Sequence, residues 1–568
     1  MSKFDLVIRG GTVIDGSGSA AIAADVAVSA GQIVEVGKVE GLGKQELNAA
    51  GALVTPGFVD IHTHYDGQAT WSNRMSPSNN HGVTTVVMGN CGVGFAPCRT
   101  ADHELLIELM EGVEDIPGAV LHEGLPWDWE SFPEYMDYLD QREFDMDIGA
   151  QLPHGALRVF VMGRRGADLA PATADDVAQM RKLTREAINS GALGFSSSRT
   201  LNHRSSNGSP TPSLDATLEE LLGISLGLKD AGEGVIEMIS DFKDLKEEFS
   251  NLEVMMRESG RPMSISVAQG LNPQGWLELM GKVDMANAAG MKMRGQVAPR
   301  GIGVLMGFTT TLNPFSTRAS FVEIAHLPLP DMLSALRDPS RKARILSEEP
   351  ASGFKRLFAM MAGGRKLWDL GDPPNYEPSP EDSIYSRSKA MGQDAWSYAY
   401  DLLLEKDGTV ILYTPFANYA ENNLDCCREM ILHDHTVMGL GDGGAHVGTI
   451  CDASFTTTML AHWGRDRKRG GLIDLPTLVR CQTHDTAKAM GLGDRGLLVS
   501  GKRADINIID FENLKVRSPE MVYDLPNGSP RVQQKADGYI ATIVNGQVTY
   551  RNGEATESLP GRLIRGSR

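Results

Sequence analysis

Short apolar runs separated by Gly, Asp and Ser fill about the first 55 residues of the chain. The runs are Asp5–Asp15, Ala24–Val28 and Gln32–Gly37. Runs of this length between turn-forming residues predict β-strands joined by tight turns. The same texture returns near the other end in Gly501–Asp510 and Tyr539–Tyr550, where Asn545-Gly546 predicts a hairpin turn. Both ends of the chain are therefore expected to contribute strands to one small β-sandwich.

The middle of the chain repeats a different unit of apolar strand, Gly-rich turn and amphipathic helix. The expected strands are Phe58–Ile61, Thr84–Met88, Asp147–Gln151, Leu193–Phe195, Gly234–Ile239, Ser264–Val267, Lys292–Gln296, Val410–Tyr413 and Val437–Leu440. Helices such as Ala174–Ile188 lie between some of them. Strands that alternate with helices predict a parallel sheet, and at this length we expect an α/β fold with a (β/α)8 TIM-type barrel.

These patterns divide the chain into a barrel and a smaller domain. We expect residues 57–490 to form the barrel, and residues 1–56 plus 491–568 to form the β-sandwich domain. Residues 301–400 interrupt the repeat, because they are rich in Pro, Arg and Ser and include a predicted helix at Leu329–Arg337. Long irregular segments inside a compact domain are often functional, so we expect this insertion to act as a lid.

Composition limits the cellular compartment and the classes of binding partner that we expect for this chain. The chain has 54 Lys+Arg against 73 Asp+Glu, a net charge of −19, which argues against nucleic acid and anionic membranes as partners. Its six cysteines have no regular spacing and are expected to be reduced thiols. We see no signal peptide and no apolar run of transmembrane length, so we expect a cytoplasmic protein. A second copy of the chain, in a homo-oligomer, is a further candidate partner.

The first candidate for chemistry is His62-Thr63-His64, at the end of the predicted strand Phe58–Ile61. Strand side chains alternate between two faces, so both imidazoles point the same way. Two neutral imidazoles side by side form half of a site for a divalent metal ion. The alternative is that they are ordinary polar residues at a strand end.

Two further candidates follow predicted strands in Gly-rich turns. Cys91 could supply a thiolate ligand for zinc, or it could be a small buried residue of the turn. Asp442 could ligate a metal ion and accept a proton from water, or it could simply form a turn. His446, four residues later, could bind substrate or cap a helix.

The segment Gly57–Asp66 is similar to the signature opening of the amidohydrolase superfamily. The turn Gly89–Pro97 looks like that of the N-acyl-D-amino-acid deacylase (D-aminoacylase) branch, in which this Cys is a zinc ligand. The resemblance covers nearly the whole chain. It implies a (β/α)8 barrel with a small β domain, bound zinc and hydrolysis of an N-acyl amide bond.

The chain departs from this family at two strand ends. The family carries a His at the end of its fifth strand with an Arg two residues later, and here those positions are Ile239 and Asp241. In the sixth strand Val267 replaces a His, and Gln269 replaces a Lys that would help to hold the substrate. Both imidazoles of the second metal position are therefore missing. We expect one zinc ion, with two as the alternative.

Other residues could compensate for these losses. By strand parity, Glu237 and Gln269 could contribute oxygen to a remodelled site, or they could be satisfied polar residues of the barrel. Arg199 or Arg204 could hold a substrate carboxylate. His203, in the same loop, could replace a missing metal ligand or lie at the surface.

The sequence thus predicts a metal-dependent amidohydrolase for a small-molecule N-acyl substrate. His62, His64, Cys91 and Asp442 would hold the ion, and Asp442 would take the proton of metal-activated water. One alternative is hydrolysis of a cyclic amide, lactone or carbamate, because the same centre attacks any activated carbonyl. The other is a non-catalytic descendant of the fold that binds a ligand or supports an assembly.

Overall fold

Eight parallel strands form the central sheet of the computed structural model, which describes residues 2–566. Along the chain they are β6 (Phe58–Asp60), β7 (Val83–Met88), β8 (Asp147–Pro153), β9 (Gly194–Arg199), β10 (Val235–Ser240), β11 (Met263–Ser266), β12 (Met293–Val297) and β16 (Thr436–Met438). The strands β6 and β16 lie at the two edges of the sheet, and a bridge between Thr63 and Gly443 joins the segments that follow them. The sheet is therefore a nearly closed barrel, and the predicted (β/α)8 fold is confirmed.

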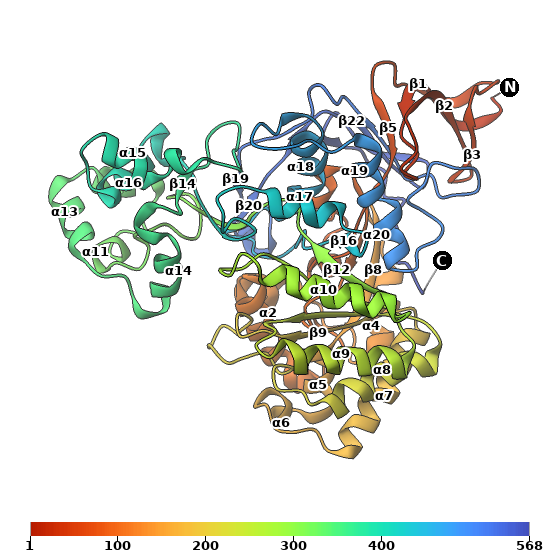
Figure 1. The fold of residues 1–568 in the computed structure, drawn as a ribbon, viewed down its shortest axis with the longest axis horizontal. Coiled ribbons are helices and arrows are strands. Elements are labelled where there is room, and N and C mark those ends of the chain that lie inside the picture. The colour runs from red at the N-terminus through yellow and green to blue at the C-terminus, as the bar shows by residue number, and fades with distance from the viewer. Residues whose placement is uncertain (1, 567–568) are drawn as a thin grey trace.

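Burial explains why the sequences of these strands are continuous apolar runs. Every residue of β6, β7 and β8 is buried, as expected for parallel strands that are covered on both faces. The predicted helix at Ala174–Ile188 is α7 (Ala174–Asn189), which starts with a capping box between Thr173 and Asp176. Helices α7 to α10 pack against the sheet in the lower part of Figure 1.

The remaining helices of the barrel follow the same order of strand and helix. They are α1 (Gln68–Trp71), α2 (His103–Glu114), α3 (Gly118–Gly124), α4 (Phe132–Asp140), α5 (His154–Met162), α6 (Arg164–Ala167), α8 (Leu218–Ala231), α9 (Leu245–Ser259), α10 (Gly275–Ala288), α17 (Asp425–Leu432), α18 (Phe455–Ala461), α19 (Leu475–Cys481) and α20 (His484–Ala489). In the part of the chain that the structure describes, no helix combines the length and the apolar character needed to cross a membrane.

The insertion between β12 and β16 forms a lobe with a hydrophobic core of its own. Its strands β13 (Ile302–Met306), β14 (Trp368–Asp369) and β15 (Leu412–Ala417) make a three-stranded antiparallel sheet. Its helices are α11 (Ala319–Val322), α12 (Leu329–Leu336), α13 (Pro339–Ser347), α14 (Lys355–Met360), α15 (Ile384–Ala390) and α16 (Ala395–Leu403). The lobe extends to the left in Figure 1, and its role as a lid stays a prediction.

One expected barrel strand belongs to this lobe instead. The prediction of a barrel strand at Val410–Tyr413 was wrong, because β15 pairs antiparallel with β13 and β14. Val410 and Leu412 are buried in the core of the lobe with Phe308 and Leu333. An apolar run has the same pattern in either sheet, so the sequence alone could not assign it.

Both ends of the chain build one nine-stranded sheet, as predicted. It contains β1 (Phe4–Val13), β2 (Ile22–Ser29), β3 (Gln32–Gly37), β4 (Gly43–Asn48), β5 (Leu53–Pro56), β17 (Ile506–Ile509), β22 (Tyr539–Val544), β23 (Gln547–Arg551) and β24 (Glu554–Ala555). Its core combines Ile8 and Val54 from one end with Ile506 and Ile543 from the other. The hairpin between β22 and β23 turns at Asn545-Gly546, both with positive φ, as the sequence predicted. Two small hairpins, β18 (Lys515–Val516) with β21 (Ala536–Asp537) and β19 (Glu520–Val522) with β20 (Arg531–Gln533), complete this end.

A buried ion-pair network joins the C-terminal segment to the barrel. Arg495 donates from Nη1 to Asp147 Oδ2 at 2.7 Å, and Arg503 donates from Nη2 to Asp147 Oδ1 at 2.9 Å. Asp147 is the first residue of β8, and its side chain and that of Arg495 are each 3% exposed. The network therefore fixes the C-terminal segment at the amino-terminal side of the barrel, opposite the strand ends that carry the chemistry.

We expect Arg495→Ala to lower the free energy of unfolding by about 3–5 kcal/mol, because it leaves the Asp147 carboxylate buried with one partner fewer. Arg517→Ala is the matched control, because Arg517 also pairs with an aspartate but is 56% exposed, and it should cost at most about 1 kcal/mol. Denaturant unfolding measures both. A loss below about 1 kcal/mol in the Arg495 variant would contradict the assigned role.

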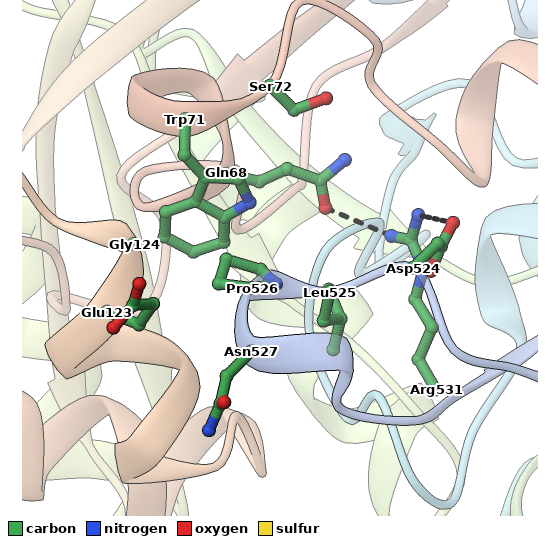
Figure 2. A pocket seen from close by; sticks show the side chains of 10 residues that line it. All are labelled: Gln68, Trp71, Ser72, Glu123, Gly124, Asp524, Leu525, Pro526, Asn527 and Arg531. Carbon is green, nitrogen blue, oxygen red and sulfur yellow. Dashed lines mark hydrogen bonds and ion pairs between the residues drawn. The ribbon is translucent and has the colours of Figure 1, made fainter.

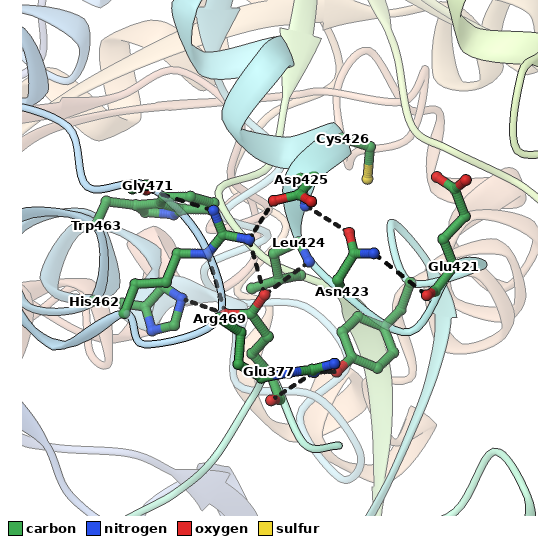
Figure 3. Close-up of polar contacts among 12 residues, drawn as sticks. Glu377, Glu421, Asn423, Leu424, Asp425, Cys426, His462, Trp463, Arg469 and Gly471 are labelled. Atoms are coloured by element: carbon green, nitrogen blue, oxygen red, sulfur yellow. Dashed lines mark hydrogen bonds and ion pairs between the residues drawn. The ribbon is translucent and has the colours of Figure 1, made fainter. Parts of the chain in front are cut away.

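A second buried network joins the lobe to the barrel, around Glu377 (Figure 3). Glu377 accepts hydrogen bonds from Arg467 Nε at 3.2 Å, Arg467 Nη2 at 2.9 Å and the Leu424 amide at 3.0 Å. His462 Nε2 lies 3.3 Å from its Oε2. Burial alone would raise the pKa of Glu377, but the hydrogen bonds from His462 and Arg467 outweigh it and lower the pKa to about 2. The folded protein therefore holds this carboxylate in its ionised form.

This shift predicts how the Glu377 contribution depends on pH. A lowered pKa gives stability that is complete above the ordinary value of 4.5 and is lost as the pH falls toward about 2. Glu377→Gln should be less stable than the parent at pH 7, and this gap should shrink between pH 4.5 and 2. Thermal unfolding across this range tests it, with the exposed Glu554→Gln as the control that follows the parent. A gap that stays constant with pH would exclude the network as its source.

Candidate metal centre

The two histidines of the H-x-H motif lie buried just past the end of β6. Their ring centroids are 5.5 Å apart, and their side chains are each 1% exposed. Hydrogen bonds from the backbone join this segment to the one that follows β16. The Asp442 amide donates to the His62 carbonyl at 3.0 Å, and the His64 amide donates to the Gly443 carbonyl at 2.8 Å. Closure of the barrel thus places Asp442 beside both histidines.

Four predicted ligands converge at this point. His62 Nε2 lies 3.3 Å from Cys91 Sγ and 3.4 Å from Asp442 Oδ1, and His64 Nε2 lies 3.5 Å from the same oxygen. The donor atoms of His62, His64 and Cys91 all lie within 4.8 Å of one another. Two imidazole nitrogens, a sulfur and a carboxylate oxygen this close together match the ligand types and the compactness of a zinc site.

The Cys91 turn is held by polar side chains from neighbouring strands. Glu237 Oε2 on β10 accepts the Cys91 amide at 3.0 Å, Ser196 Oγ on β9 accepts the Gly92 amide at 3.0 Å, and Asp66 Oδ2 accepts the Gly89 amide at 3.1 Å. The other carboxylate oxygen of Glu237 is buried without a hydrogen-bond partner. A bound cation would satisfy such an oxygen, so this orphaned atom also fits a metal centre.

Two residues that the sequence analysis missed orient the histidines. His62 Nδ1 lies 2.7 Å from Gln296 Oε1 on β12, and the Gln296 amide in turn donates to Ser264 Oγ at 2.8 Å. His62 therefore carries its proton on Nδ1 and presents the Nε2 lone pair to the cluster. His64 Nδ1 lies 3.2 Å from Glu114 Oε1 at the end of α2. Contacts of this kind to metal-bound histidines fix the tautomer and the ring orientation.

Burial shifts the pKa values of the side chains that meet at the centre. Burial raises the pKa of the Cys91 thiol well above its ordinary value and raises the pKa of Glu237 to about 7. It lowers the pKa of His64 to about 4. For Asp442 burial is outweighed by the hydrogen bond from His64 and by the charges of His62 and His64, which hold its pKa below the usual range. A divalent cation would favour the thiolate and the carboxylates.

The backbone here adopts left-handed conformations that side chains rarely allow. Cys91, Leu440, Asp442 and His446 have φ of 54°, 59°, 46° and 49°. Residues in such conformations cost of order 1–3 kcal/mol each and cluster at functional sites. Gly441 has no room for a side chain, because a Cβ would meet Asp60 Oδ2 at 2.5 Å. The Gly-rich sequence around Asp442 is therefore required by close packing.

Three of the residues predicted to bind substrate border the centre. Glu237 contacts the Cys91 turn, and His446 Nε2 lies 3.8 Å from Glu114 Oε2. His203 is half-buried, and Ser198 Oγ lies 2.9 Å from its Nδ1. Burial and the charges of His446 and His64 lower the pKa of His203 to about 3, so this imidazole is neutral.

The other three residues predicted to bind substrate form hydrogen bonds away from the centre. They are Arg199, Arg204 and Gln269. Arg199 donates to the Ala216 carbonyl, and the exposed Arg204 donates to the carbonyls of Leu201 at 3.2 Å and Gly208 at 3.0 Å. Gln269 accepts the Ala420 amide at 3.1 Å and donates to Glu421 Oε2 at 3.2 Å. None of these hydrogen bonds within residues 2–566 reaches the four residues of the centre, and a role in substrate binding stays a prediction.

A second group of possible ligands lies apart from the centre and is internally satisfied. His435 Nδ1 lies 2.7 Å from Asp284 Oδ1, and His433 Nε2 lies 3.4 Å from Asp284 Oδ2. The His435 amide donates to His433 Nδ1 at 3.1 Å. His433 therefore carries its proton on Nε2, toward Asp284, and has no free lone pair for a metal ion. The contacts with Asp284 give these two histidines a structural role.

A surface cavity of about 440 Å³ lies between α1, α3 and the loop before β20 (Figure 2). Arg531 at its edge pairs with Asp524 at 2.7 Å and donates to Gln68 Oε1 at 3.1 Å and to the Ser76 carbonyl at 2.8 Å. The guanidinium is thus fully engaged. None of the residues that line this cavity belongs to the four-residue centre, so we assign it no part in the chemistry.

The role of Gln296 gives a direct test of the centre. Gln296→Leu should weaken metal binding about 10- to 100-fold, because His62 loses the partner that fixes its tautomer. Competition with a chromophoric chelator measures the affinity. Gln534→Leu is the matched control, since Gln534 is buried but donates to the Arg517 carbonyl away from the centre. A folded Gln296 variant with the parental affinity would contradict the assignment.

Comparison with known proteins identifies the family. Residues 45–550 match the Amidohydrolase family. The chain is 27% identical over 604 residues to an uncharacterized protein of Mycobacterium tuberculosis, covering 97% of this chain and 92% of that protein. It is 32% identical over 231 residues to the D-aminoacylase of Alcaligenes xylosoxydans xylosoxydans, covering 40% of this chain and 43% of that enzyme.

A solved structure supports the same fold. It is described as "The functional role of the binuclear metal center in D-aminoacylase. One-metal activation and second-metal attenuation". It matches with a TM-score of 0.66 at 23% identity, covering 99% of this chain and 100% of that one. The family match spans the whole barrel and all four residues of the centre, and the chain belongs to the amidohydrolase family.

Proposed function

We propose that this amidohydrolase cleaves an N-acyl amide bond and uses one zinc ion held by His62, His64, Cys91 and Asp442. The observation that carries the proposal is the convergence of Cys91 Sγ and Asp442 Oδ1 on His62 Nε2, at 3.3 and 3.4 Å. A sulfur ligand with two imidazoles favours zinc over magnesium or calcium, which prefer oxygen. The similarity to a D-aminoacylase supports an N-acyl substrate.

Zinc bound here would polarise the amide carbonyl and ionise water at neutral pH. The side chains of the centre supply the proton transfers. The Asp442 carboxylate lies beside the Nε2 atoms of both histidines, at 3.4 and 3.5 Å, so it is placed to accept the proton of the attacking water and pass it to the leaving amine. Gln296 orients His62 through its contact with Nδ1, Glu114 lies 3.2 Å from His64 Nδ1, and both histidines are buried.

The residues at the ends of β10 and β11 favour a site for one metal ion over a site for two. The positions that carry a second pair of histidines in the family are Ile239 and Val267, and Val267 is fully buried in the apolar core. An apolar side chain offers no ligand. A second ion would have to rely on Glu237 and His203, which is fewer ligands than zinc sites usually contain.

Metal analysis and hydrolysis together test the proposal. The parent should hold about one zinc per chain, and His62→Ala and Asp442→Ala should lose it. His435→Ala, in the unrelated Asp284 group, should keep it. The zinc-loaded parent should release amine from a panel of N-acyl compounds, and Asp442→Asn should reduce this rate about 10²- to 10⁴-fold. A folded, zinc-supplemented parent that holds no metal, or that holds zinc and releases no amine, would refute the proposal.

A further inference from the structure

The charged side chains around the centre are mostly acidic. Buried carboxylates surround it, with exposed fractions of 8%, 3%, 2%, 1% and 5%. They are Asp60, Asp66, Glu114, Glu237 and Asp452. A divalent ion brings two positive charges, which the Cys91 thiolate and the Asp442 carboxylate balance. None of the further carboxyl groups, whether ionised or protonated, supplies a positive charge that would attract an anion.

Arg300 is the best candidate among the buried residues after β12 to bind a substrate carboxylate. Its positive charge is already paired with Asp452. It follows β12 and is 1% exposed. Its Nη2 donates to Asp452 Oδ1 at 3.2 Å and to the Cys451 carbonyl at 3.1 Å. Its Cζ lies 3.5 Å from the ring centroid of Tyr376 and 5.0 Å from that of Phe455. A substrate carboxylate would have to displace Asp452 to reach this charge.

The strand ends that follow β10 and β11 are used to hold loops. Asp241 accepts hydrogen bonds from Thr200 Oγ1 at 2.5 Å and from the Leu201 amide at 2.9 Å. Gln269 links the end of β11 to Ala420 and Glu421. Neither position offers a cation, and Asp241 adds a negative charge.

The remaining basic residues near these loops attract an anion weakly or not at all. Arg199 is half-buried, and its Nη1 is committed to the Ala216 carbonyl in the loop before α8. Arg204 and Lys243 are exposed to solvent, where water and salt screen their charges. The electrostatics therefore disfavour a substrate that carries a carboxylate beside the amide.

We propose that this centre selects N-acyl compounds whose amine part is uncharged, and that Asp452 sets this preference by neutralising Arg300. The inference rests on the proposed function and adds the substrate class. Arg300 Nε and Asp452 Oδ2 are both buried without a hydrogen-bond partner. A neutral polar group such as a carboxamide can accept from the first atom or donate to the second, whereas a carboxylate can only accept.

Matched substrate pairs test the proposal. Each pair is an N-acetyl amino acid and its carboxamide, in both stereochemical series and with several side chains, assayed with the zinc-loaded parent. The assay is run at pH 8, because burial raises the pKa of Asp452 to about 7 and its carboxylate should be ionised. We expect kcat/KM to be at least about tenfold higher for the carboxamide of each hydrolysed pair.

Asp452→Asn should shift this ratio about tenfold or more toward the carboxylate, because it frees the Arg300 charge. Asp425→Asn is the matched control, since it removes a partner of another buried arginine, Arg467, and should leave the ratio unchanged. If the Asp452 variant does not fold, the ratio of kcat/KM for the carboxamide to that for the carboxylate in the parent decides whether the proposal holds. Hydrolysis with a preference for the carboxylate overturns this inference and leaves the proposed function standing. Hydrolysis of neither member of any pair overturns both.

Discussion

Two backbone hydrogen bonds close the barrel and bring Asp442 next to His62 and His64. The Asp442 amide reaches the His62 carbonyl, and the His64 amide reaches the Gly443 carbonyl. They join the ends of the first and the last strand in the sheet, β6 and β16, which are separated by more of the chain than any other pair of neighbours. Asp442 can face the two histidines only when this seam is formed. The left-handed φ at Asp442 and the crowded Gly441 are the local cost of the seam.

This arrangement couples folding to the charge of the centre. The structure buries Glu114, Glu237 and the Cys91 thiol close together, and burial raises the pKa of each of them. Removing charged groups from water costs free energy that a divalent ion would offset. The ion-pair networks around Asp147 and Glu377 lie far from this centre and are balanced internally by arginine. The centre has no arginine partner of that kind among the contacts described for its four residues.

Local sequence patterns identified candidate residues for the site, and the resemblance to a family favoured a metal-binding role for Cys91. The period of two along a strand placed His62 and His64 on one face, and Gly-rich turns after buried strands pointed to Cys91 and Asp442. Gln296 and Glu114 could not be found in this way. Their roles depend on how β12 and α2 lie relative to β6, and neither residue stands out in its own segment. The same limit explains the wrong prediction of a barrel strand at Val410–Tyr413. Its partner strands in the lobe cannot be identified from a local sequence pattern.

The two missing histidines changed more than the number of metal ligands. Val267 fills its position with apolar packing, and Gln269 and Asp241 tie the following loops to the strand ends. Glu237 uses one oxygen for the Cys91 amide, so the fifth strand supports the turn that carries the proposed ligand Cys91. Glu237 is thus committed to shaping the proposed metal position. This commitment supports the proposal of a single ion, because recruiting Glu237 for a second one would loosen the Cys91 turn on which the proposed site depends.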